Sequence, residues 1–163
     1  MKLKMYLYIL FIAMLIISCS QKQIRLNDFI FEPQYIPNEC SIVKPTANEP
    51  LPFNIPDNPC VSSDTSFTKL AALLLETDEL NSTIKTALFS VYQCKNEIGI
   101  NGIEFENVTD AKKCELILNK LETDTLRFNV FRNKNIVIHL WRDDIIDSCY
   151  YDFEKLIKDR LNL

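Results

Sequence analysis

The amino-acid sequence predicts an α+β fold: a small single domain in which an antiparallel sheet, including a C-terminal β-hairpin, packs against several helices. Three patterns indicate this. All seven prolines lie between positions 33 and 59, so the remainder is free to form regular structure. Helical apolar stripes occur before and after a strand-like region, and that region alternates apolar and polar residues around an Asn-Lys-Asn turn. A sequence in which helical segments flank a hairpin is typical of a domain whose helices pack on an antiparallel sheet.

The proline-rich stretch predicts an extended tether over residues 19–59. A proline lacks the backbone N–H and biases the residue before it away from helical geometry. Five large apolar side chains indicate that parts of the tether pack onto the domain: Phe29, Phe31, Tyr35, Ile36 and Phe53. We therefore expect the domain itself to span residues 60–163.

Two helices are expected in the first part of the domain. The first begins near Ser63 or Asp64, which are residue types that cap helices, and continues to about Thr77. The next apolar series repeats about every 3.6 residues and favours a helix over residues 80–94. Strand alternation through residues 86–93 remains the open alternative.

The later elements have clearer signals. A short strand is expected over residues 98–105, followed by a helix from Thr109 that turns Cys114 toward the core. Asp143 and Asp144 are favourable at the start of a final helix, because acidic groups complement the helix dipole there. The apolar stripe of this helix comprises Ile146, Cys149, Tyr150, Phe153, Leu156, Ile157 and Leu161.

The strongest local prediction is a hairpin over residues 126–142. A three-residue loop of residues 133–135, with Asn135 in the left-handed conformation, pairs Phe128 with Leu140. The buried face then carries Leu126, Phe128, Val130, Ile136, Ile138 and Leu140. The opposite face carries Arg127, Asn129, Phe131, Val137, His139 and Trp141.

That opposite face supplies the candidate binding surface. Its proposed members are Arg127, Asn129, Phe131, His139 and Trp141. Aromatic and arginine side chains dominate binding hot spots, so a strip of this composition is typical of a protein-binding surface. The alternative is that another helix simply covers this face.

The N-terminus has the features of an export signal. A short basic region precedes the apolar run Met5–Ile17, whose 13 residues are too few to cross a membrane core that needs roughly 20. The sequence Ile-Ile-Ser-Cys at positions 16–19 resembles the lipobox of bacterial lipoproteins. The resemblance implies that residues 1–18 are a signal peptide and that Cys19 becomes the acylated first residue, which anchors the protein in a membrane.

The residues after the cysteine bear on which membrane this is. Ser20 follows directly, and no acidic residue occurs before Asp28. By the same resemblance, serine at this position implies the outer membrane, facing the periplasm, rather than retention in the inner membrane.

Five cysteines remain for the mature domain: Cys40, Cys60, Cys94, Cys114 and Cys149. An exported compartment permits disulfides, and the candidates are Cys40, Cys60, Cys94 and Cys114. A Cys40–Cys60 bridge would staple the tether to the domain. An odd set leaves at least one thiol outside any intramolecular pair. The alternative is that several are small buried apolar residues. The chain contains no C-x₂-C pair, so we expect no zinc site and no other metal.

Composition and motifs exclude several functional classes. The net charge is −4 and no block of Lys and Arg occurs, so nucleic acid is not an expected partner. Only two glycines are present, which leaves no glycine-rich loop for a nucleotide, and no cofactor is expected. A catalytic role for His139 would require Cys149 with Asp143 or Asp147, but Cys149 lies on an apolar helical stripe.

These observations predict a membrane-anchored envelope lipoprotein, not an enzyme, that acts as a protein-binding module. An immunity protein or inhibitor against an envelope-acting toxin is one concrete form. The alternative is a structural or accessory subunit of an outer-membrane assembly. A hydrolase with an unrecognised site is the least favoured reading.

Overall fold

The computed structural model describes residues 24–46, 51, 55, 57–121, 128–143 and 148–163. Its elements in chain order are the 3-10 helix η1 (Leu26–Phe29), β1 (Ser41–Ile42), β2 (Cys60–Ser62), α2 (Thr65–Leu74), the 3-10 helix η3 (Asp78–Thr83), β3 (Ile84–Gln93), β4 (Glu97–Phe105), α3 (Val108–Leu121), β5 (Asn129–Asn133), β6 (Ile136–Arg142) and α4 (Ser148–Leu161). The strands form one six-stranded antiparallel sheet. The predicted α+β class is confirmed.

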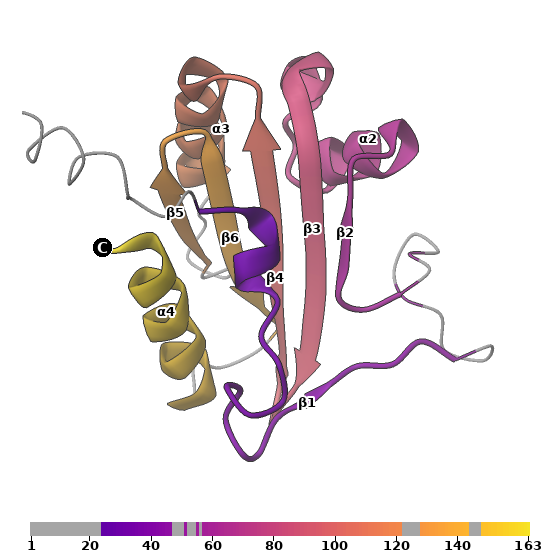
Figure 1. Ribbon diagram of the computed structural model, residues 1–163, viewed down its shortest axis with the longest axis vertical. Coiled ribbons are helices and arrows are strands. Elements are labelled where there is room, and N and C mark those ends of the chain that lie inside the picture. The colour runs from indigo at the N-terminus through magenta and orange to yellow at the C-terminus, as the bar shows by residue number, and fades with distance from the viewer. Residues whose placement is uncertain (1–23, 47–50, 52–54, 56, 122–127, 144–147) are drawn as a thin grey trace, which may run out of the picture.

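The sheet is covered by helices on both sides (Figure 1). The strand order is β1-β3-β4-β6-β5, and β2 pairs with the same strand, β3, as β1 does. We call the side covered by α4 and η1 the α4 face, and the side covered by α2 and α3 the α2–α3 face. The main core lies on the α4 face, where the sheet contributes Leu88, Tyr92, Ile98, Ile100, Ile138 and Leu140.

Local sequence signals account for the helices. The side chain of Asp64 caps α2, since its Oδ1 accepts hydrogen bonds from the backbone N–H groups of Ser66 (2.8 Å) and Phe67 (3.3 Å). Cys114 of α3 is fully buried, as its place on the apolar stripe predicts. The described stripe of α4 is also buried, apart from the partly exposed Leu156.

Residues 84–93 form a strand, so the helix favoured by the apolar spacing is wrong and the strand alternative is right. Six consecutive residues, 87–92, are buried because β3 is an interior strand of the sheet and both faces of the sheet are covered there. A strand that is buried on both faces loses its apolar–polar alternation. Its apolar run then matches a helical period as readily as a strand period.

The C-terminal hairpin forms, but its register differs by one residue from the prediction. The turn contains two residues, Lys134 and Asn135, and the positive φ (52°) belongs to Lys134. Phe131 therefore pairs with Ile138, and Asn129 with Leu140. The predicted faces of β6 are correct, whereas those of β5 are exchanged, because a slip of one residue moves every side chain to the opposite face.

The described part of the expected tether belongs to the folded domain. Leu26, Phe29 and Phe31 are at most 1% exposed and join the main core together with Ile36. Tyr35 stays on the surface, where the Arg160 guanidinium lies 5.8 Å from its ring centroid. The packed domain thus begins near Ile24 rather than at Cys60. The predicted signal peptide, Cys19 and Phe53 lie outside the described residues.

One edge of β3 is built from two short strands with an asparagine between them. Ile42 of β1 pairs with Tyr92, and Cys60 of β2 pairs with Phe89. In the gap, the Asn58 side chain accepts a hydrogen bond from the Val91 N–H at 2.9 Å and donates to the Val91 carbonyl at 2.6 Å. It also donates to the carbonyl of Val43 at 2.7 Å. The amide side chain therefore adds to the one backbone bond here, which the Val43 N–H donates to the Val91 carbonyl at 3.2 Å.

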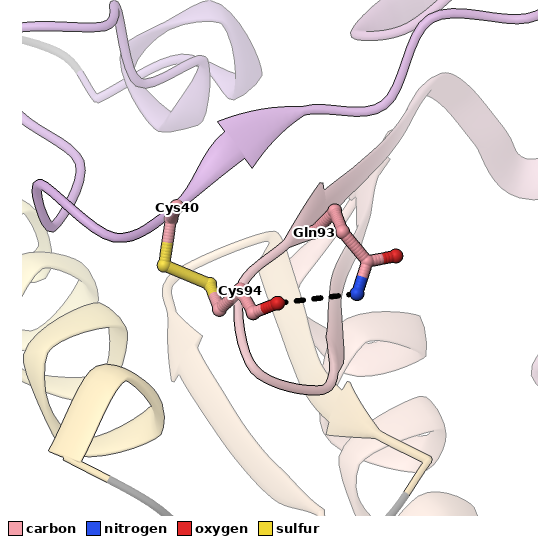
Figure 2. The surroundings of a disulfide bond; sticks show 3 residues. All are labelled: Cys40, Gln93 and Cys94. Carbon is pink, nitrogen blue, oxygen red and sulfur yellow. Dashed lines mark hydrogen bonds between the residues drawn. A yellow bond between two sulfur atoms is a disulfide. The ribbon is translucent and has the colours of Figure 1, made fainter.

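The disulfide joins Cys40 to Cys94, not Cys40 to Cys60. Figure 2 shows that it links the segment leading into β1 with the turn that follows β3. The backbone carbonyl of Cys94 also accepts a hydrogen bond from Gln93 Nε2 at 3.2 Å. Two of the four candidate cysteines, Cys60 and Cys114, are thiols. Spacing in the sequence does not reveal the pairing, because it depends on which turns the sheet brings together.

Candidate functional site

The structure does not bring the five predicted surface residues together. His139 and Trp141 lie on the α2–α3 face, whereas Asn129 and Phe131 lie on the α4 face, where Phe131 is buried in the core. Arg127 lies outside the described residues. The one-residue shift in the hairpin register is the cause, so the strip proposed from the sequence is not a single surface.

A cleft lies on the α2–α3 face beside His139 and Trp141. It is shallow and partly open, with an enclosed volume of only about 10 Å³, and it is lined by Ile55, Phe67, Leu70, Ala71, Leu88, Phe89 and Asn101. Helix α2 forms one wall and strands β3 and β4 form the floor. Asn101 is the single polar residue in this lining. Its volume is too small to enclose a small molecule, so the cleft suits surface contact with an apolar group of a partner.

Trp141 lies next to this cleft in a position that only a glycine permits. It packs against the apolar cluster that includes Phe67 and Leu70. Its neighbour on β4 is Gly99, where an added Cβ would lie 2.0 Å from Trp141 Cε2. The indole therefore rests on the bare backbone of β4, which fixes its orientation.

His139 lies directly across from Asn101 in the β4–β6 ladder. The ring of Phe128 contacts it edge-on, with 4.6 Å between ring centroids. Burial lowers the pKa of His139 to about 4, so its imidazole is neutral near pH 7. Within the described part of the chain, neither imidazole nitrogen has a hydrogen-bond partner.

Buried polar atoms that bond to no described residue are concentrated here. Besides both nitrogens of His139, Asn101 Oδ1 and Trp141 Nε1 are buried and make no hydrogen bond to any described residue. A buried polar group left unsatisfied costs about 1–3 kcal/mol, so native proteins seldom retain several in one place. Together they offer an acceptor on Asn101, a donor on Trp141 and either function on His139. Of these three residues, Asn101 lines the cleft itself, and His139 and Trp141 lie beside it.

The catalytic constellation considered for His139 is not assembled. Cys149 packs in the core on the α4 face, so the sheet separates it from His139. Cys60, in contrast, packs against the apolar cluster that contains Phe89 and Val91 on the α2–α3 face. Burial and the nearby Asp57 carboxylate raise its thiol pKa, which disfavours the nucleophilic thiolate.

Comparisons of the chain with protein-family models, with curated proteins and with solved structures find no match. The candidate site therefore rests on its own geometry.

Sequence reasoning identified His139 and Trp141 but missed the rest of the site. Asn101 had a detectable signal, since it is a polar residue in the middle of an expected strand. Gly99, in the same strand, had a second signal, because a glycine inside a strand often marks close approach by another group. The α2 residues had none, because their apolar stripe is the same whether a helix covers a core or lines a cleft.

The buried imidazole predicts a loss of stability in acid. In the unfolded chain His139 takes up a proton near pH 6.5, whereas in the folded protein its imidazole stays neutral down to about pH 4. The free energy of unfolding should therefore fall by up to about 3 kcal/mol between pH 6.5 and pH 4 through this group alone. Urea denaturation of the wild type and of His139→Phe at several pH values measures this contribution.

At neutral pH, the stability of His139→Phe shows whether the substitution itself disturbs the packing. Because the imidazole nitrogens bond to no described residue, an aromatic ring without them should be as stable as the wild type or more stable at pH 7. If the variant and the wild type lose stability in parallel on acidification, His139 is not the group responsible.

Proposed function

We propose that this protein is a lipid-anchored envelope protein that holds a protein partner without performing a reaction on it. An immunity protein or inhibitor against an envelope-acting toxin is the specific form that we favour. The lipobox-like sequence ending at Cys19 supports the anchor. The Cys40–Cys94 disulfide supports an exported location, because such bonds persist in oxidising compartments. Among the described helices, every one is too short or too polar to cross a bilayer.

An apolar cleft beside polar atoms that bond to no described residue is the observation that supports the binding proposal. Asn101, His139 and Trp141 carry buried polar atoms that bond to no described residue, and a buried polar group left unsatisfied costs stability. Stability sacrificed at one place on a protein is typical of a functional site. A partner that lays an apolar side chain over the cleft, with a peptide group beside it, would cover the cleft and supply partners for these atoms.

The same site supports binding rather than catalysis. A histidine acting as general base needs a nucleophile in hydrogen-bond reach and an orienting acid on its other nitrogen. His139 bonds to no described residue through either nitrogen, and its low pKa makes it a weak base. These properties fit a neutral hydrogen-bonding surface.

Photocrosslinking in living cells tests this function. A benzophenone amino acid at Phe67, which lines the cleft, should crosslink to a distinct protein partner. The same amino acid at Lys155, which is exposed on α4 on the other side of the sheet, should not. Substituting Asn101→Leu in the Phe67 probe should weaken the crosslink at an unchanged protein level, since the acceptor is lost while the volume is kept.

Cys19→Ala completes the experiment by testing the anchor, and this variant should appear in the soluble fraction. A crosslinked toxin would support the immunity form, and an integral outer-membrane protein would assign the accessory role instead. Equal crosslinking from both positions, or none from Phe67, would contradict the cleft as the recognition site.

A further inference from the structure

Three sulfur atoms meet at one corner of the domain. The Sγ atoms of Cys40, Cys94 and Cys149 all lie within 4.8 Å of one another. Cys40 directly precedes β1, Cys94 directly follows β3, and Cys149 is in the first turn of α4. Two of these sulfurs form the disulfide shown in Figure 2, and the third belongs to a thiol that is 1% exposed. Three segments far apart in the sequence thus place a thiol beside a disulfide.

This arrangement favours sulfur exchange over metal binding. A metal site would require all three sulfurs as thiolates. Two of them are bonded to each other here. A thiolate next to a disulfide, in contrast, already has both reactants of an exchange reaction in place.

We propose that Cys149 exchanges with the Cys40–Cys94 disulfide inside the folded protein. The Cys149 thiol gives its proton to solvent, which later returns one to the leaving thiolate, and the Cys149 thiolate attacks the Cys94 sulfur. A Cys94–Cys149 bond forms as the Cys40–Cys94 bond breaks, and the departing Cys40 thiolate takes up a proton. Attack on the Cys40 sulfur instead forms Cys40–Cys149 and releases Cys94. Each step conserves one disulfide and one thiol, so no oxidant or reductant is consumed.

Chain connectivity does not oppose the first of these exchanges. The observed bond spans 54 residues, and a Cys94–Cys149 bond would span 55. Disulfides that close loops of equal length constrain the unfolded chain equally. The two bonds should therefore coexist in amounts set by local packing.

Exchange changes which end of the domain is bonded to the turn after β3. In the observed form, that end is the N-terminal segment, which packs its core residues Phe29 and Phe31 against the sheet. After exchange with Cys94, it is α4, and the N-terminal segment keeps only noncovalent contacts. Because this segment follows the proposed anchor, the cluster would determine whether the anchor side of the chain is covalently attached to the sheet.

Disulfide mapping of the full chain tests this inference, with Cys19→Ser in every variant to remove the sixth thiol. The Cys40→Ser variant is equilibrated with reduced and oxidised glutathione at neutral pH, quenched with acid and mapped by mass spectrometry without reduction. We expect most of Cys94 to be bonded to Cys149. Cys94→Ser should give a Cys40–Cys149 bond in the same way. In the wild type, a minor Cys94–Cys149 species should appear, and its rate of formation should rise with pH.

The remaining thiols provide the controls. Cys60 and Cys114 lie on the α2–α3 face, across the sheet from the cluster, so they should stay reduced in every variant. If Cys40→Ser unfolds, as far-UV circular dichroism would show, Cys94→Ser provides the same test in a different background. Cys94 recovered as a thiol or a glutathione adduct, or joined equally to Cys60 and Cys114, would overturn the inference.

Discussion

Replacing Phe153 with alanine is expected to lower the free energy of unfolding by about 3–5 kcal/mol. Phe153 is fully buried on α4, and its ring centroid lies 4.6 Å from that of Tyr92 on β3 and 6.1 Å from that of Phe31. Its side chain thus joins the C-terminal helix, the sheet and the N-terminal segment. Small domains are stable by only about 5–15 kcal/mol, so the variant should be close to unfolding. Urea denaturation gives the value directly.

A control variant and a double-mutant cycle test whether buried packing causes this loss of stability. Tyr151→Ala removes an aromatic ring from the same helix, but that ring is 58% exposed, so the loss should stay below about 1 kcal/mol. A double-mutant cycle between Phe31 and Phe153 should show a coupling of at least about 0.5 kcal/mol, because their rings are in contact. Strictly additive losses would mean that the N-terminal segment does not pack on α4.

Asn58→Asp is expected to lower the free energy of unfolding by about 3 kcal/mol or more at pH 7. The substitution keeps the shape of the side chain and the acceptor for the Val91 N–H. It replaces the amide donor, however, with an oxygen that faces two carbonyl oxygens at 2.6 and 2.7 Å. The side chain is only 6% exposed, so water cannot readily relieve this repulsion.

The pH dependence of Asn58→Asp distinguishes this mechanism from a general loss of packing. Repulsion and burial should raise the pKa of the introduced carboxyl above its unfolded value, and the protonated acid regains a donor. The penalty relative to the wild type at the same pH should therefore shrink as the pH falls. Asn119→Asp, an exposed change on α3, should show neither effect. A penalty that does not change with pH would reject the proposed hydrogen-bond reversal.

The helices and the C-terminal hairpin were predictable because their signals are local. The capping side chain of Asp64 and the apolar stripes of α3 and α4 depend on residues only a few positions apart. The strand β6 was also predictable, because one face meets the core and the other carries His139 and Trp141. In contrast, β3 was ambiguous, since burial on both faces removes the alternation by which a strand is detected.

The candidate site was predictable only in part. His139 and Trp141 were selected from β6, and they do lie beside the cleft. Asn129 and Phe131 were selected from β5 and lie on the wrong face, because a turn of two residues was taken for a turn of three. The length of this turn depends on the backbone conformation of Lys134. The free energy of that conformational preference is small compared with the free energy of packing the whole sheet.

By itself, the sequence determined the α+β class, the positions of α2, α3 and α4, and the buried stripes of α3 and α4, because these properties follow from neighbouring residues. Only the tertiary structure decided that the N-terminal segment joins the core, that Asn58 completes a strand edge, and that Cys40 bonds to Cys94 with Cys149 alongside. Each of these depends on contacts between residues at least 33 positions apart, as between Asn58 and Val91. The free energy of such contacts comes from the assembled sheet, so no local pattern in the chain encodes it.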